Sequence, residues 1–205
     1  MEQIQSRVNI YALISRILLQ ELDLELLKTM KNDETILEFF PTFRDWDWLK
    51  DVDEKKLLDE AINPDFVNLG VLHLIPYETF YTRDDQQIET GGANPVTDIY
   101  SSYDFTVDYE VARTVSSDHI GIELEFMHHL CVAEQKALEN NDDSAVQELR
   151  EGQHEFLNKH LLNWAPMYLI NMKYEARTPL YFDAADMALE FILSDNEYLV
   201  ETLKK

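Results

Sequence analysis

The sequence contains little cysteine, glycine and proline, few basic residues and no long apolar run. A single cysteine in 205 residues excludes an intrachain disulfide and a multi-cysteine zinc site. Five glycines leave little backbone for cradling a nucleotide, and with only six prolines the chain is neither linker-rich nor collagen-like. No run approaches the roughly 18 apolar residues of a membrane-spanning helix, and the N-terminus lacks the uninterrupted apolar region of a signal peptide. These absences predict a soluble protein of a reducing, cytoplasmic compartment.

Basic residues are outnumbered by acidic ones, 17 to 40, which gives a formal net charge of −23. A field of that sign repels the phosphate backbone of nucleic acids and anionic lipid headgroups. We therefore expect no nucleic-acid partner and no direct insertion into a membrane. The acidic surface either serves solubility alone or attracts a basic partner such as an arginine-containing peptide, and charge by itself does not decide between them.

Apolar residues recur at three- and four-residue spacing along most of the chain, which predicts an all-α fold, a helical bundle of about ten helices. Between residues 83 and 102 the sequence is polar, contains two glycines and a proline, and has no helical period, so a long loop or hinge is expected there. We expect a single domain, residues 1–205, with two sub-parts, 1–82 and 103–205, joined by the loop 83–102. The chain would then be a monomer or a dimer exchanged through this loop.

The expected helices begin and end at capping residues, prolines and changes of period. Ser144 and Gln147 form a capping box at one helix start, and Asp195 is expected to cap a short terminal helix. The longer helices are expected at residues 4–22, 24–30, 34–40, 53–62, 64–75, 105–112, 118–140, 144–174 with a kink at Pro166, and 179–192.

The expected helix 118–140 carries two unusual features. Glu123 falls near the middle of the apolar stripe of this helix. Its carboxylate should therefore be paired with another group, be protonated, or have a functional role. We expect an architectural role in which Glu123 accepts hydrogen bonds from Tyr, Trp or backbone N–H groups of a neighbouring segment. Asp118 and His119 precede the helix, with Ser116 and Ser117 available as caps, and Asp118 either complements the helix dipole or takes part in recognition.

Aromatic residues form a second constellation in the segment PYETFYT. Tyr77, Phe80 and Tyr81 lie three and four residues apart, so on a continuing helix their rings share one face. Such a face belongs to the core, or, if partly exposed beside acidic residues, it suits a peptide with apolar and arginine side chains. Trp164 and Pro166 either border such a groove or pack at a kink.

Two Glu-x-x-His pairs resemble those of di-iron helical bundles, Glu125 with His128 and Glu151 with His154. Their positions on the helical wheel lie away from the apolar stripes, whereas a metal site inside a bundle needs them to face inward. A di-iron or di-manganese protein is kept as the alternative function.

No Walker motif, nucleophile elbow or HExxH helix is present, so we expect no catalytic residues and no enzyme activity.

The segment DHIGIELEFMHHL, followed about thirty residues later by FLNKHLLNWAPMYL, resembles the TorD/DmsD-type redox-enzyme maturation chaperones of the TorD/NarJ-like superfamily. PYETFYT and NPVTDIY resemble two further elements of that family. Ser117 stands where the family has a proline, so the entry into the helix is expected to be less rigid. The positions that carry the resemblance are Asp118, His119, Glu123, Leu124, Phe126, Met127, Leu130, Phe156, His160, Leu161, Trp164 and Pro166.

The resemblance implies an all-helical cytoplasmic chaperone that binds the twin-arginine signal peptide of a molybdopterin-dependent oxidoreductase and assists its maturation. Its partners would be the catalytic subunit of that oxidoreductase and the signal peptide. Some members also bind guanine nucleotide or molybdopterin cofactor, and we predict no cofactor from the residues themselves. The implied peptide-binding residues are Asp118, His119, Tyr77, Phe80, Tyr81 and Ser117, with Glu123, His160, Trp164 and Pro166 at the groove border or in structural roles.

The expected mechanism is an acidic groove lined by aromatic rings. Arginines of the peptide would meet carboxylates such as Asp118, and the apolar run would meet Tyr77, Phe80 and Tyr81. A charged His119 would repel those arginines, so release of the peptide is expected to depend on pH.

Overall fold

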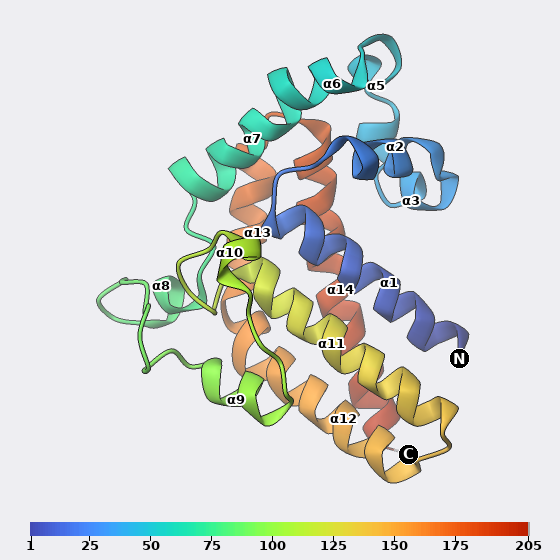
Figure 1. Ribbon diagram of the computed structural model, residues 1–205, viewed down its shortest axis with the longest axis vertical. Helices are drawn as coiled ribbons and strands as arrows, with labels where there is room; N and C mark the ends of the chain where they lie inside the picture. The colour runs from blue at the N-terminus through green and yellow to red at the C-terminus, as the bar shows by residue number, and fades with distance from the viewer. Residues whose placement is uncertain (205) are drawn as a thin grey trace. The chain divides into compact units, whose positions relative to one another are not determined.

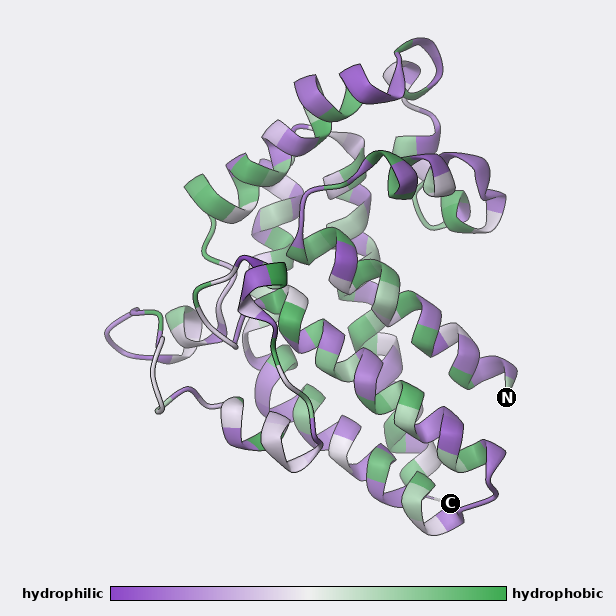
Figure 2. Cartoon of the chain, viewed as in Figure 1, coloured by the Kyte–Doolittle hydropathy of each residue, from purple (hydrophilic) through white to green (hydrophobic). Residues whose placement is uncertain are grey.

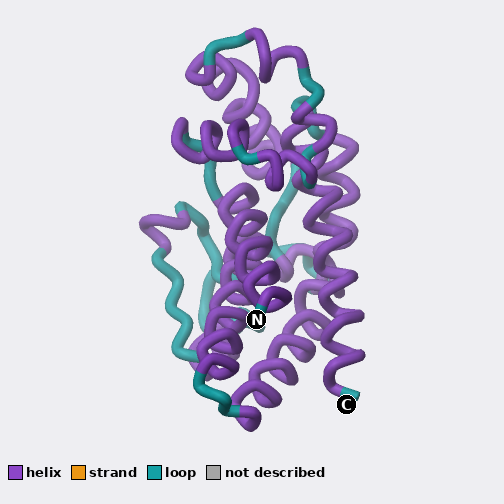
Figure 3. Tube along the Cα trace, turned by 90° about the vertical axis from the view of Figure 1, so that its right-hand side faces the viewer, coloured by secondary structure: helices purple, strands orange, loops and turns teal. Residues whose placement is uncertain are grey.

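A computed structural model describes residues 1–204 of the chain. Helices and the loops between them make up this part of the chain, with no strand among these residues (Figure 3). The prediction of an all-α fold is confirmed. Within the same residues, no helix is both long and apolar enough to cross a membrane.

The helices differ widely in length, from four residues to twenty-five. Three π-helical segments, η1 to η3, interrupt them. Along the chain the order is α1 (Glu2–Leu19), α2 (Leu24–Asn32), α3 (Glu34–Glu38), α4 (Pro41–Arg44), α5 (Asp47–Asp51), α6 (Glu54–Leu57), η1 (Leu58–Ile62), α7 (Asn63–Val67), η2 (Asn68–His73), α8 (Glu78–Thr82), α9 (Thr97–Ser102), α10 (Tyr109–Ala112), α11 (Ile120–Glu139), α12 (Asp143–Phe156), η3 (Leu157–Leu161), α13 (Leu162–Glu175) and α14 (Pro179–Leu203).

The chain divides into two compact units. Unit 1 comprises residues 1–19, 77–165 and those from 191 onward, and unit 2 comprises residues 20–76 and 166–190. This division differs from the expected sub-parts 1–82 and 103–205. The loop 83–102 lies inside unit 1, and the boundaries fall instead near residues 19 and 76 and within α13 and α14. The chain therefore leaves unit 1 and returns to it twice.

In unit 1, α1 runs beside α11, and hydrophobic and hydrophilic residues alternate along both helices (Figures 1 and 2). The two backbones approach closely where Gly121 faces Leu19. A Cβ atom on Gly121 would lie 2.6 Å from Leu19 Cβ and 2.8 Å from Leu19 Cα. Glycine is therefore required here for close helix packing.

A buried guanidinium joins four helices of unit 1. Arg7 on α1 is 4 % exposed and donates to both carboxylate oxygens of Asp195 on α14, at 2.5 and 2.9 Å. It also donates to Glu134 on α11 at 2.8 Å and to Gln153 on α12. The prediction that Asp195 caps a terminal helix is wrong, because α14 continues through Asp195 and its carboxylate binds Arg7 inside the unit.

In unit 2, side-chain amides and carboxylates bind backbone groups of segments distant in sequence. Asn63 pairs with the backbone of Leu22 in both directions, each at 3.1 Å. Asp183 on α14 accepts from the Phe43 N–H at 2.8 Å. Asp65 is buried and accepts from Thr178 N and Oγ1, both at 2.8 Å, just before α14 begins.

Several expected element boundaries shift for physical reasons. Residues 54–73 form one continuous helical stretch instead of two helices, because π-helical η1 widens the helix just before Pro64, whose nitrogen has no hydrogen to donate. Within the expected loop 83–102, residues 97–102 form α9, and of the expected helix 105–112 only α10 is helical. Asp142, not Ser144, caps α12 by accepting from Ala145 N.

Candidate functional site

Several polar side chains are buried at the start of α11 in unit 1. Asp118 is fully buried, and its Oδ2 accepts from Thr79 N at 2.8 Å and from Thr79 Oγ1 at 2.6 Å. Its backbone carbonyl accepts from Glu78 N at 3.0 Å. Asp118 therefore caps the first turn of α8, across 39 residues of sequence, instead of its own helix.

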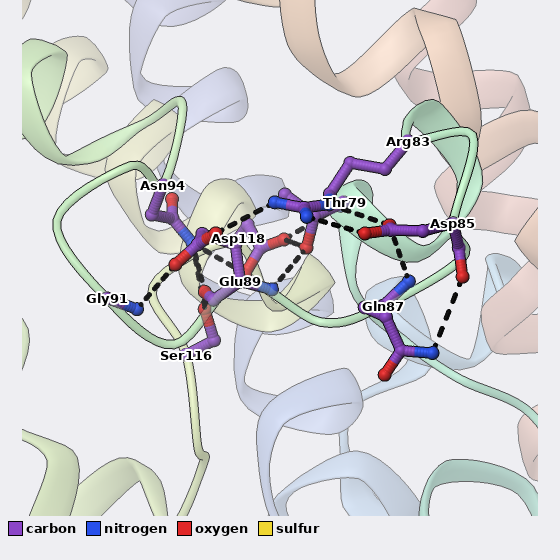
Figure 4. Close-up of polar contacts among 9 residues, drawn as sticks. All are labelled: Thr79, Arg83, Asp85, Gln87, Glu89, Gly91, Asn94, Ser116 and Asp118. Carbon is purple, nitrogen blue, oxygen red and sulfur yellow. Dashed lines mark hydrogen bonds and ion pairs between the residues drawn. The ribbon is translucent and has the colours of Figure 1, made fainter.

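The other carboxylate oxygen of Asp118 binds the loop that follows α8 (Figure 4). Asn94 Nδ2 donates to Asp118 Oδ1 at 2.9 Å, and Ser116 Oγ lies 2.5 Å from the same atom. Asn94 Nδ2 also donates to the Glu89 carbonyl at 3.0 Å, and Ser116 Oγ lies 2.6 Å from the same carbonyl. Asn94 from this loop and Ser116 from the turn before α11 thus meet at one buried carboxylate, and both oxygens of Asp118 have partners.

An arginine at the end of α8 holds the first turn of the same loop (Figure 4). Arg83 pairs with Asp85 at 2.7 Å and with Glu89 at 2.8 Å. The Glu89 N–H donates to Thr79 Oγ1 at 3.0 Å. The loop is therefore attached at both its start and its middle to α8.

His119 is the N-cap of α11, where Ser116 or Ser117 was expected. Its Nδ1 accepts from Gly121 N at 3.1 Å, and its ring meets that of Tyr77 edge-on with centroids 5.1 Å apart. Burial lowers the pKa of His119 to about 4, against the opposing effect of the Asp118 charge. The imidazole is therefore neutral near pH 7, which does not support the expected pH-sensitive release through this residue.

Ser117 is buried, and its polar groups contact two tyrosine side chains. Its Oγ lies 2.5 Å from the Tyr109 hydroxyl, and its carbonyl accepts from the Tyr100 hydroxyl at 3.2 Å. Both tyrosines thus hold the turn that leads into α11. At this position, where the family has a proline, the Ser117 hydroxyl contacts the Tyr109 hydroxyl.

Glu123 has the architectural contact that its sequence position predicts. It is fully buried on α11, and its Oε2 accepts from Trp164 Nε1 at 3.2 Å, while Oε1 has no hydrogen-bond partner among residues 1–204. Burial raises the pKa of Glu123 well above its usual range, and the charges of Glu78 and Asp118 add to this effect. The surroundings of Glu123 therefore favour its neutral form.

His160 and Trp164 also lie in the interior of unit 1, not at a groove border. His160 on η3 is within 2.9 Å of Glu78 Oε2 through its Nδ1. Trp164 stacks on Tyr81 with ring centroids 5.4 Å apart. Pro166 lies inside α13, half-buried, and belongs to unit 2.

The three residues of the aromatic segment have different exposures. Tyr77 is 9 % exposed, whereas Phe80 and Tyr81 are half-buried and meet edge-on with centroids 5.2 Å apart. The Tyr77 hydroxyl accepts from Val115 N at 3.3 Å. Phe80 and Tyr81 are thus the members of this segment that reach the surface.

Sequence reasoning missed the exposed apolar residues beside this segment. Val115 is 62 % exposed, and Tyr109 and Val111 on α10 are also exposed. α10 is a single turn that ends at Arg113 with a left-handed φ of 54°. No periodic pattern in the sequence marks that ending, so no sequence signal identifies these residues.

The two Glu-x-x-His pairs do not form a metal site. Glu125 and Glu151 are exposed, and His128 and His154 are half-buried. Within residues 1–204, no three His, Cys, Asp or Glu side chains are grouped in a way that could hold a metal ion. The di-iron alternative therefore lacks its ligand set in the described chain.

Comparison with known proteins gives relatives of one kind. A family model described as nitrate reductase delta subunit matches residues 33–169. A chaperone protein TorD of Vibrio cholerae is 29 % identical over 132 residues, covering 64 % of this chain and 57 % of the relative. Those of Aliivibrio salmonicida and Photobacterium profundum are 27 % and 24 % identical over 94 and 126 residues, covering 46 % and 62 % of this chain and 41 % and 56 % of the relatives.

The chain matches less than two thirds of the length of these curated relatives. They are named chaperones. No solved structure matches the chain. The family model covers α3 to most of α13, including Asp118, Glu123 and Trp164. The protein therefore belongs to the nitrate reductase delta subunit family, the family of the TorD-type maturation chaperones.

Proposed function

We propose that this protein is a cytoplasmic chaperone that binds the twin-arginine signal peptide of a molybdopterin-dependent oxidoreductase and assists maturation of that enzyme. Its family membership and the chaperone names of its relatives support this role. The proposed partners are the catalytic subunit of the oxidoreductase and its signal peptide. Binding of guanine nucleotide or molybdopterin, and exchange of the loop 83–102 between two copies, stay predictions.

The single observation that carries the proposal is an apolar surface beside the start of α11. It consists of Phe80, Tyr81 and Val115, all at least partly exposed. Tyr77 connects them, because its hydroxyl accepts from Val115 N and its carbonyl accepts from Phe80 N. Such a surface suits the apolar run of a signal peptide.

Asp118 has a different role in this proposal from the one its sequence position suggests. A fully buried carboxylate that already accepts four contacts cannot meet a peptide arginine without breaking them. Asp118 is therefore a positioning residue, which holds α8 and its loop in place. The peptide arginines would meet exposed carboxylates on the flanking segments, such as Asp84 and Glu110.

Titration calorimetry with a synthetic twin-arginine signal peptide tests the proposal. The wild-type protein should bind this peptide more tightly than a version with two lysines, because guanidinium groups pair with carboxylates through two hydrogen bonds. Val115→Asp should weaken binding at least roughly tenfold, since it places a charge against the apolar run. The same substitution at Val71 is the matched control, because Val71 is equally exposed at 68 % but lies in unit 2.

Two results would contradict the proposal. Absence of heat with signal peptides from several oxidoreductases would remove peptide binding altogether. Equal weakening by Val115→Asp and Val71→Asp would leave peptide binding in place but remove the surface around Tyr77 as its site.

A further inference from the structure

Unit 2 contains a pocket that none of the proposed peptide-binding residues lines. Its volume is about 310 Å³, enough for a side chain or a small ligand. The pocket brings together residues from the two sequence segments of the unit, 20–76 and 166–190. It is lined by Trp46, Trp48, Glu60, Ala61, Pro64, Asp65, Arg177 and Thr178.

Two indole rings contribute to the apolar lining of this pocket, together with Ala61 and Pro64. Trp46 precedes α5 and Trp48 lies on it, and their rings are parallel within 5° with centroids 5.9 Å apart. Trp48 is 42 % exposed, which is unusual for so large an apolar side chain. The face of an indole carries negative potential and attracts cations more strongly than other aromatic rings do.

A buried carboxylate with a spare acceptor lies in the wall of the pocket. Asp65 is 2 % exposed, and its Oδ2 accepts from Arg177 N, Thr178 N and Thr178 Oγ1. Its Oδ1 has no hydrogen-bond partner among residues 1–204. An unpaired buried acceptor costs free energy, so a ligand that donates to it would be stabilised.

The remaining charges of the pocket favour a cation. Glu60 is exposed, and its only ion pair within the described residues is a long one, 3.8 Å, to the exposed Lys56. Arg177 is the one basic residue in the lining, against the two carboxylates of Glu60 and Asp65. The formal charge of −23 on the whole chain acts in the same direction.

We propose that this pocket binds the guanidinium group of an arginine side chain in a peptide. A guanidinium is planar, stacks on an indole face, and has five N–H donors that match the Asp65 and Glu60 oxygens. A lysine ammonium would gain the charge interaction without the planar stacking. Arg177 at the rim opposes the bound cation, so it lowers the affinity of the pocket. The inference goes beyond the proposed function, because it adds a separate site in unit 2.

Tryptophan fluorescence reports directly on this pocket. The chain has three tryptophans, and Trp164→Phe leaves only Trp46 and Trp48 as emitters. Titration of this variant with N-acetyl-Arg-Arg-amide should give a saturable change in emission. The Lys-Lys counterpart should bind roughly threefold to tenfold more weakly, and the uncharged citrulline counterpart should give no change. Calorimetry on the wild-type protein with the same three probes checks that Trp164→Phe has not altered the pocket.

Three substitutions test the roles of individual residues, each measured by calorimetry with the Arg-Arg probe. Trp48→Ala should abolish measurable binding, and Glu60→Gln should weaken it several-fold. Arg177→Gln should strengthen it, a result that loss of folding cannot imitate. Glu139→Gln is the matched control for Glu60→Gln, because it removes the same charge from an exposed residue at the end of α11 in unit 1.

The inference is overturned if the three probes give equal responses, if the Arg-Arg probe gives none, or if Glu139→Gln weakens binding as much as Glu60→Gln. Failure of the pocket and failure of the proposed function are distinguishable. Val115→Asp should leave binding of the Arg-Arg probe unchanged while it weakens binding of the signal peptide. Binding of the signal peptide without any response to the Arg-Arg probe would overturn the pocket alone.

Discussion

Three buried carboxylates near the start of α11 are accommodated in three different ways. Asp118 accepts from backbone and side-chain donors, and Glu78 lies against the His160 imidazole. Glu123 has one donor, Trp164, and keeps an acceptor without a partner among residues 1–204. Burial raises the pKa of Glu123, and the nearby charges of Glu78 and Asp118 add to this effect, so its protonated form is favoured.

Glu123→Gln tests this protonation. The pKa of Glu123 is raised in the folded protein above its usual value of 4.5, so the unfolded chain loses this proton at lower pH than the folded protein does. Its contribution to the free energy of unfolding is therefore fully present below pH 4.5 and declines as pH rises above it. Glutamine keeps an acceptor for Trp164 and does not titrate. Urea unfolding between pH 5 and 8 should show the wild type losing stability relative to the variant, and parallel pH profiles would contradict this.

His119→Asn should change the acid side of the stability profile. The pKa of His119 is lowered from 6.5 to about 4, so its contribution to stability is present above pH 6.5 and is lost as pH falls through 4. The loss corresponds to about 3 kcal/mol. Asparagine retains an N-cap acceptor for Gly121 N without titrating. The wild type should therefore lose more stability than the variant in urea unfolding between pH 6.5 and 4, and an equal loss in both proteins would exclude a buried neutral imidazole.

At the scale of elements, the contact between α1 and α11 depends on one missing side chain. Gly121→Ala should destabilise the protein by about 1–3 kcal/mol, because the added Cβ meets the backbone of Leu19 as well as its side chain. Gly70→Ala in η2 is the matched control, since nothing lies within 4 Å of an added Cβ there, and it should be neutral or slightly stabilising. Thermal unfolding of both variants measures the difference, and equal melting temperatures would contradict the close packing.

Long helices were predictable from sequence and short ones were not. The expected helix 118–140 corresponds to α11, Ile120–Glu139, because its apolar period continues over five turns. α10 has one turn, too short for any period to appear. The helix start expected at Asp195 was wrong, because α14 continues through this residue, and an acidic residue at a helix start and one buried inside a helix look alike in sequence. The contacts of Asp195 with Arg7 and Tyr11 on α1, more than 180 residues away, distinguish the two.

At the scale of the whole molecule, the net charge of −23 should govern how fast a basic peptide arrives. The association rate of the twin-arginine peptide should fall roughly tenfold between 20 and 300 mM salt, while its dissociation rate changes little. Long-range attraction is screened by salt, whereas apolar contacts around Tyr77 are not. Stopped-flow mixing measures both rates. An association rate independent of salt would mean that charge serves solubility alone.

The sequence by itself determined the all-α class, the presence of long helices such as α11, the family motif and the need of Glu123 for a donor, because these depend on local period and residue type. Only the tertiary structure decided which residues meet. It joined Asp118 to Thr79 and Asn94, divided the chain into units with boundaries inside α13 and α14, and brought Trp48 and Asp65 into one pocket with Arg177. Contacts between residues far apart in sequence depend on how helices pack, and packing leaves no periodic signal along the chain.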